Sequence, residues 1–210
     1  MYRPKLFCED DLPTLHALMQ EHSFAALITQ HPETGLFATH MPFVLDSTRG
    51  PYGTLLAHMA RANPHWRAFE SEQEALIIFQ GPHTYISPSW YAEKLNVPTW
   101  NYAVVHAYGR PRIIEDEAEI YKLLQTLTDK SEAQFEAPWQ METLPDDFVY
   151  KKIPGVVAFE MEITRLEGKF KMSQNRPQGD QLRVTATLKE SQDPTNMSVA
   201  EAMEGVRARR

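Results

Sequence analysis

The sequence has little cysteine, no excess of positive charge and no long apolar run. Among its 210 residues Cys8 is the single cysteine, so neither an intrachain disulfide nor a cysteine-based metal cage can form. With 21 basic and 28 acidic residues, the net charge of -7 argues against wrapping nucleic acid through phosphate contacts. No stretch approaches the ~20 apolar residues of a membrane span. Acidic residues precede any apolar run at the start, so we expect no signal peptide and a cytoplasmic protein.

Several catalytic and metal-binding motifs are also missing. The eight histidines form no HxxxH or HExxH spacing on an expected helix, and neither a GxSxG elbow nor a P-loop occurs. These absences argue against a hydrolase and predict no metal site. His40, His58 and His106 fall within expected strands, where a hydrogen-bonded structural histidine is the ordinary interpretation.

The residues that are present indicate a mainly β fold with peripheral helices. Apolar patterning predicts strands over residues 24–29, 36–45, 54–59, 75–80, 99–114 and 156–166. The first two flank a turn over residues 31–35, and the strand over 75–80 is apolar enough to be central. In the strand over 99–114, Gly109 and Pro111 indicate a bend or a sheet edge.

Fewer helices are expected than strands. A helix is predicted to begin near Asp10 or Asp11, a short one to cover residues 64–69, and an amphipathic one to cover 116–128. Ser198 and Glu201 have the spacing of a capping box for a last helix. Sparse helices around closely spaced strands favour an antiparallel barrel. We expect one domain over residues 1–210, with a helical segment from about residue 177.

Four clusters combine polar and aromatic residues in a way that a plain core does not require: residues 39–42, 58–66, 81–91 with 97–102, and 169–176. Arg61 and Asn63 lie beside an expected helix start, where an anion is favoured, although Asn63 could merely cap that helix. The last cluster could equally be a solvated loop. The cations and hydroxyl suited to a phosphate are Arg61, Lys171, Ser173 and Arg176.

Aromatic residues near these clusters have two interpretations. They could stack on a planar ring or serve as ordinary strand packing, and they are Trp90, Tyr91, Trp100 and Tyr102. A phosphate site beside aromatic rings describes a flavin mononucleotide site, which composition alone does not establish.

At these clusters the chain resembles the PaiB family of FMN-binding negative transcriptional regulators. The stretches that carry the resemblance are MYRPKLF, ATHMPFVLD, GTLLAHMARANPHW, ALIIFQGPHTYISPSWY, VPTWNYAVVHAYGRPRII and FEMEITRLEGKFKMSQNR. The resemblance implies an FMN-binding split β-barrel and a homodimer with flavin sites between the two barrels.

The resemblance also implies cofactor-binding residues. The residues expected at the phosphate and ribityl chain are Ala60, Arg61, Asn63, Lys171, Ser173, Gln174, Asn175 and Arg176. Those expected around the ring are Thr39, His40, Pro42, Ser87, Trp90, Tyr91, Thr99, Trp100, Asn101 and Tyr102. No catalytic residue stands out.

Three functions remain open from the sequence. The first is a dimeric FMN-binding protein that influences gene expression, and the second is a flavin-dependent oxidoreductase that uses a reduced nicotinamide or a small substrate. The third is haem binding through an exposed histidine such as His65 or His83. Direct DNA binding has weak support, because only the end of the chain, with Arg207, Arg209 and Arg210, offers a basic surface.

Overall fold

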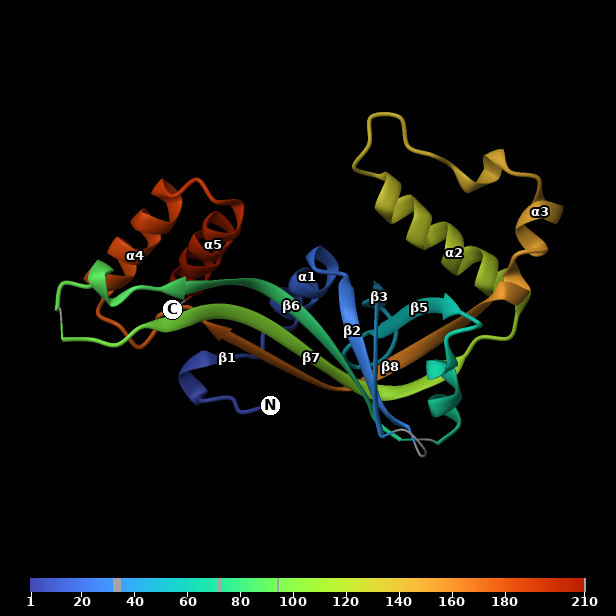
Figure 1. The fold of residues 1–210 in the computed structure, drawn as a ribbon, viewed down its shortest axis with the longest axis horizontal. Helices are drawn as coiled ribbons and strands as arrows, with labels where there is room; N and C mark the ends of the chain where they lie inside the picture. The colour runs from blue at the N-terminus through green and yellow to red at the C-terminus, as the bar shows by residue number, and fades with distance from the viewer. Residues whose placement is uncertain (32–34, 72, 94, 210) are drawn as a thin grey trace. The chain divides into compact units, whose positions relative to one another are not determined.

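One mostly antiparallel sheet organises the computed structural model, which describes residues 1–31, 35–71, 73–93 and 95–209. The strands are β1 (Cys8–Glu9), β2 (Phe24–His31), β3 (Gly35–Pro42), β4 (Val44–Asp46), β5 (Thr54–Ala60), β6 (Ala75–Ile86), β7 (Thr99–Ile113) and β8 (Val156–Lys171). Their order in the sheet is β3-β2-β6-β7-β8-β5-β4, with β1 paired to β8 (Figure 1). β2 pairs antiparallel with both β3 and β6, and β5 pairs antiparallel with both β4 and β8. Over the described residues this order has two ends, β3 and β4, so the sheet is not closed.

Helices connect and follow the strands. The α-helices are α1 (Leu12–Glu21), α2 (Glu117–Glu132), α3 (Asp146–Tyr150), α4 (Gln178–Glu190) and α5 (Pro194–Ala208). Short 3-10 helices are η1 (Lys5–Phe7), η2 (Pro64–Ser71), η3 (Pro88–Trp90), η4 (Met141–Thr143) and η5 (Ile153–Gly155). None of the helices in the described part of the chain has the length and hydrophobicity needed to span a membrane.

The chain divides into two compact units. We call residues 1–18, 80–106 and 167–210 the terminal unit, and residues 19–79 and 107–166 the middle unit. The strands β6, β7 and β8 each contribute residues to both units.

In the terminal unit, α4 and α5 form a packed helical pair. Val184 and Leu188 of α4 and Val199 and Met203 of α5 are buried. The Asp180 carboxylate at the start of α4 accepts a hydrogen bond of 2.8 Å from the backbone N–H of Ala92. This bond ties α4 to the segment that follows η3.

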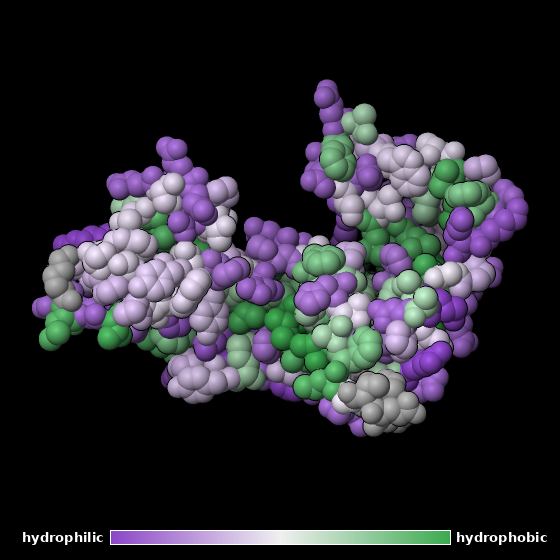
Figure 2. Space-filling view, viewed as in Figure 1, coloured by the Kyte–Doolittle hydropathy of each residue, from purple (hydrophilic) through white to green (hydrophobic). Residues whose placement is uncertain are grey.

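In the middle unit, an apolar stripe on α2 packs into the core. The buried residues of this stripe are Ile120, Leu123 and Leu127, as the period of the sequence predicts. They share a cluster with Val44 of β4 and Ala158 of β8. Figure 2 shows hydrophobic side chains gathered beside α2, with polar side chains around them.

Two expectations about strands have different outcomes. The strand over residues 75–80 is confirmed as an inner strand, because β6 lies between β2 and β7. The sheet edge at Gly109 and Pro111 is wrong, because β7 runs unbroken through both residues and lies between β6 and β8. A Cβ at Gly109 would overlap the carbonyl oxygen of Glu162 on β8. The glycine therefore permits close approach of two backbones rather than marking an edge. The expected turn over 31–35 falls largely at 32–34, outside the described residues.

The capping box expected at Ser198 and Glu201 is also wrong. The last helix begins at Pro194, and the Asp193 carboxylate accepts from the backbone N–H groups of Thr195 and Asn196. Ser198 lies inside α5 and donates to the carbonyl oxygen of Pro194. Aspartate caps helices as well as serine does, and proline favours the first helical position, so the helix starts earlier than the box suggests.

Candidate functional site

A buried histidine organises the middle-unit part of the predicted site. His65 is 0% exposed, and its ring nitrogens lie 2.8 Å from the Thr29 hydroxyl and 2.7 Å from the Thr39 hydroxyl. The side chain of Asn63 donates to the Thr39 hydroxyl and accepts from the backbone N–H of His65. Asn63 therefore caps η2, which is the structural alternative stated for it above. Because both ring nitrogens are engaged, the expectation that His65 is an exposed haem ligand is wrong.

The predicted phosphate residue Arg61 is anchored to the backbone. Its Nε donates to the carbonyl oxygen of Pro154 at 2.7 Å, and its Nη2 donates to that of Val156 at 2.9 Å. These two bonds use part of the guanidinium fork and leave other N–H donors on an exposed side chain. The remaining predicted residues of this unit, His40, Pro42 and Ala60, are exposed.

The terminal unit contains a group of cations without acidic partners. Lys169, Lys171 and Arg176, which we call the cation group, form no ion pair with a carboxylate among the described residues. Burial lowers the pKa of Lys171, and the charges of Lys169 and Arg176 lower it further. The Lys171 ammonium donates to the Thr99 hydroxyl and to the Trp100 carbonyl oxygen. An anion placed here would relieve the mutual repulsion of the three cations.

Aromatic rings accompany the cation group. The Arg176 guanidinium lies 4.4 Å from the ring centre of Tyr91, and the Lys169 ammonium lies 5.3 Å from that of Tyr102. Trp100 is 54% exposed and meets Tyr85 edge-on at 6.1 Å. Tyr91 is buried, so packing rather than stacking on a ligand describes this residue. Of the four aromatic residues predicted to contact the ring, Trp90, Tyr91, Trp100 and Tyr102, Trp100 is the exposed one.

The loop that follows Lys171 and carries Arg176 is held by buried polar contacts. Asn101 and Ser173 are buried, and their side chains exchange hydrogen bonds of 3.0 and 3.1 Å. Ser173 has φ 63°, a left-handed conformation that is rare for a residue other than glycine. Gln174 accepts from the backbone N–H of Met172. Ser173 and Gln174 therefore shape the loop, which is not the simple solvated loop of the alternative interpretation.

The predicted residues fall into two sets. The middle unit holds Thr39, His40, Pro42, Ala60, Arg61 and Asn63, of which Thr39 and Asn63 meet at His65. The terminal unit holds Ser87, Trp90, Tyr91, Thr99, Trp100, Asn101, Tyr102, Lys171, Ser173, Gln174, Asn175 and Arg176. There Ser87 caps η3, Trp90 is half-buried and Asn175 is exposed.

Sequence reasoning did not single out Thr29, and it included Lys169 in the cluster 169–176 without naming it as a binding residue. Lys169 alternates with Lys171 at the end of β8, and this spacing was available as a signal. Thr29 lies far from His65 in sequence, and no local pattern marks it. Among the residues that the structure describes, no cluster of His, Cys, Asp and Glu could hold a metal ion.

The unclosed antiparallel sheet with helices around it is the split β-barrel fold of flavin-binding proteins. The flavocytochrome Anf3 from Azotobacter vinelandii is similar with a TM-score of 0.59 at 17% identity, over 81% of this chain and 72% of that one. The FAD and haem binding protein from Mycobacterium smegmatis is similar with a TM-score of 0.57 at 15% identity, over 83% of this chain and 78% of that one. At such identities the likeness concerns the fold alone.

Residues 1–165 match the family described as "Putative FMN-binding domain", and the chain belongs to this family. The protein named protease synthase and sporulation protein PAI 2 of Bacillus subtilis (strain 168) is 34% identical over 204 residues, which cover 97% of each chain. This relationship confirms the family resemblance stated above. The cation group lies beyond the residues that the family description matches, within the region shared with the Bacillus protein.

Proposed function

We propose that this protein is a cytoplasmic, homodimeric split-barrel protein of one domain that binds FMN and negatively influences gene expression. Membership of the FMN-binding family supports the cofactor. The observation that carries the proposal is the cation group, whose three positive charges have no acidic partner in the described residues. An FMN phosphate supplies the missing negative charge.

The residues present fit the two ends of FMN. Lys171 and Arg176 would hold the phosphate, with Lys169 adding a third positive charge and Asn101 and Ser173 positioning the loop. Trp100, with its exposed ring, would contact the flavin ring. In the middle unit, Thr39, Arg61 and Asn63 remain predicted flavin-binding residues, and the exposed side chain of Arg61 has N–H donors besides those bound to Pro154 and Val156.

A bound flavin supplies redox or sensing chemistry, and the chain supplies binding and orientation. The Lys171 ammonium donates to the Thr99 hydroxyl and to the Trp100 carbonyl oxygen, which holds it beside the backbone of Trp100. The depressed pKa of Lys171 rises when an anion joins the group, so phosphate binding favours the charged ammonium.

We propose that gene regulation acts through a metabolite or partner protein rather than through direct DNA contact. Arg209 forms an ion pair of 3.0 Å with Glu9, and Arg207 is half-buried, while Arg210 lies outside the described residues. The end of the chain therefore offers less free positive charge than its sequence suggests. A sequence-specific gel shift that survives moderate salt would overturn this part.

An FMN-dependent oxidoreductase is the second candidate, favoured by a fold shared with a flavocytochrome. Steady NAD(P)H oxidation by the flavin-loaded protein would support it. Haem binding has less support. Of the two candidate axial ligands, His65 is buried and hydrogen-bonded, and His83 alone is exposed.

The visible absorption spectrum of the purified protein tests the proposed cofactor, together with mass spectrometry of any molecule released on denaturation. We expect flavin bands, either as purified or after FMN is added. A colourless protein that also fails to bind added FMN would overturn the proposal. Light scattering during size-exclusion chromatography tests the homodimer.

A further inference from the structure

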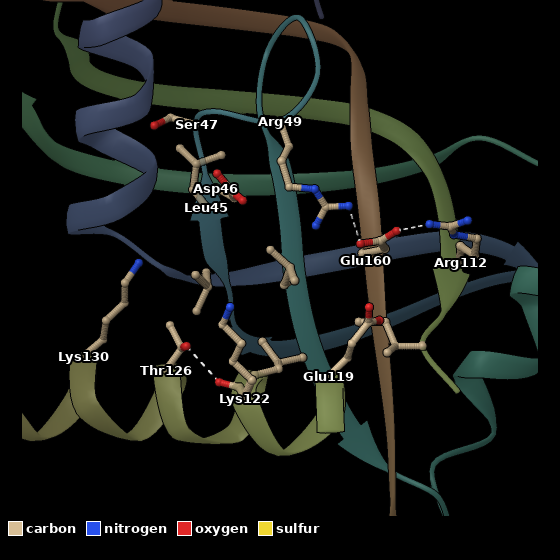
Figure 3. A pocket seen from close by; sticks show the side chains of 14 residues that line it. Leu45, Asp46, Ser47, Arg49, Arg112, Glu119, Lys122, Thr126, Lys130 and Glu160 are labelled. Atoms are coloured by element: carbon tan, nitrogen blue, oxygen red, sulfur yellow. Dashed lines mark hydrogen bonds and ion pairs between the residues drawn. The ribbon is translucent and has the colours of Figure 1, made fainter. Parts of the chain in front are cut away.

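A cleft of about 610 Å³ lies within the middle unit, between α2 and strands β4, β5 and β8 (Figure 3). Its apolar lining comes from Val44, Leu56, Ile114 and Leu123, which belong to or pack against the core under α2. The cleft contains none of the residues assigned above to flavin. Its volume lies within the roughly 300–1,000 Å³ typical of small-molecule sites.

One wall of the cleft carries two guanidinium groups on a single carboxylate. Glu160 is 13% exposed and accepts from Arg49 at 2.7 Å and from Arg112 (Figure 3). Burial alone would raise the pKa of Glu160, but the hydrogen bonds and charges of Arg112 and Arg49 outweigh it and lower the pKa. The carboxylate is therefore ionised, and this wall keeps a net positive charge.

The opposite side of the cleft carries two lysines. Lys122, Thr126 and Lys130 rise from the same face of α2, at a four-residue spacing (Figure 3). Neither lysine forms an ion pair within the described ranges of the chain. Arg49 and Lys122 both help to lower the pKa of Asp46, after the larger effect of hydrogen bonds from Thr48. Both cations thus act on the same part of the cleft.

We propose that this cleft binds a small apolar carboxylate, a molecule with an aliphatic or aromatic body and one anionic head. The body would cover the apolar lining, and the head would lie among Lys122, Lys130 and Arg49. Cations outnumber acids in the lining, because Asp46, Glu119 and Glu160 face Arg49, Arg112, Lys122 and Lys130. The Asp46 carboxylate already accepts from the N–H and the hydroxyl of Thr48. The site would make the protein responsive to such molecules independently of flavin.

Calorimetric titration with decanoate, below the concentration at which it forms micelles, tests this site in the full-length protein. We expect decanoate to bind and decan-1-ol to bind at least about tenfold more weakly, since hydrogen bonds to charged groups contribute this much. The double variant Lys122→Gln, Lys130→Gln should bind decanoate about tenfold more weakly than the wild type. Asp46→Asn should tighten it, because a competing carboxylate is lost. Thr126→Trp should abolish it by filling the cleft.

Lys151→Gln is the matched control, since Lys151 directly follows α3, lies outside the cleft and pairs with Asp147. This variant should bind decanoate like the wild type, and all variants should bind FMN unchanged. Equal affinity for decanoate and decan-1-ol, or unchanged decanoate binding in the double lysine variant, would overturn the proposal. If the double variant unfolds early in a thermal melt, the affinity of Asp46→Asn for decanoate is the test. Decanoate binding by this variant that is weaker than or equal to that of the wild type would also contradict the site.

Discussion

At the residue scale, buried hydrogen bonds of His65 join three segments of the middle unit. Its ring connects Thr29 of β2 and Thr39 of β3 to the start of η2. We expect Thr29→Val to lower the free energy of unfolding by about 1–3 kcal/mol, because it removes the hydroxyl that is hydrogen-bonded to a buried ring nitrogen of His65. Urea unfolding measures this loss.

Thr164→Val provides the control for that substitution. Thr164 lies on the exposed side of β8, where its hydroxyl donates to the Tyr108 carbonyl oxygen. If the buried hydrogen bonds of His65 stabilise the fold, Thr29→Val should lower the free energy of unfolding more than Thr164→Val does. Equal effects would show that the contacts of His65 contribute nothing particular to stability.

His58 on β5 predicts a pH dependence of stability. Burial lowers the pKa of His58 from its ordinary value of 6.5, and its Nδ1 is buried without a hydrogen-bond partner in the described residues. A depressed folded pKa means that stability is full above pH 6.5 and falls as pH drops below it, because the unfolded chain binds the proton more readily.

His58→Gln tests this linkage, because glutamine is polar and does not titrate. Urea unfolding at a series of pH values should show a smaller loss of stability below pH 6.5 in the variant than in the wild type. Parallel curves for the two proteins would rule out His58 as a source of the acid sensitivity.

At the scale of elements, the N-cap of α5 is Asp193, whereas the sequence analysis expects a capping box at Ser198. Asp193→Ala should lower the free energy of unfolding by about 1 kcal/mol, because it removes the acceptor for two backbone N–H groups. Ser198→Ala should have little effect, since Ser198 lies within the helix. Thermal unfolding compares the two, and a larger loss from Ser198→Ala would restore the capping box.

The contact between β7 and β8 depends on Gly109. A methyl group there would overlap the Glu162 backbone, so Gly109→Ala should destabilise the protein by about 1–3 kcal/mol. Gly179→Ala in α4 is the control, because a Cβ there meets no atom within 4 Å. That variant should be neutral or stabilised by up to about 1 kcal/mol. Urea unfolding that finds the two variants equal would contradict close packing at Gly109.

Strands and helices follow from the sequence to different degrees. The alternation of apolar residues locates β2, β5 and the inner strand β6, because the side-chain period of a strand is local. The same pattern cannot distinguish a sheet edge at Gly109 from a close backbone contact, since the atom that requires a glycine there is the Glu162 carbonyl oxygen on β8. Helix starts are equally ambiguous, because Asp193 and Ser198 are both acceptable caps.

At the scale of the whole molecule, the net charge of -7 conceals local groups of cations. The cation group of the terminal unit and the lysines of α2 in the middle unit both lack carboxylate partners within the described residues. The net negative charge therefore argues against a broad nucleic-acid surface but is compatible with sites for small anions.

The predicted site could be read from sequence only in part. Motifs single out Lys171, Arg176 and Trp100 as candidates, because residue chemistry and sequence neighbours are visible in the chain. Burial is not visible there, so the sequence does not show that Ser173, a predicted phosphate-binding residue, is buried and hydrogen-bonded to Asn101. Likewise His65 looked accessible and is enclosed by two threonines.

The central claim is that the cation group binds the phosphate of FMN. Calorimetric titration of the wild type, Lys171→Gln and the control Lys189→Gln with FMN and riboflavin tests it most directly, since Lys189 is a cation of the same unit paired with Glu204. We predict that the wild type prefers FMN, that Lys171→Gln loses about tenfold in FMN affinity but little in riboflavin affinity, and that Lys189→Gln changes neither. Equal binding of FMN and riboflavin by the wild type, or an equal loss for both ligands in Lys171→Gln, would contradict the claim.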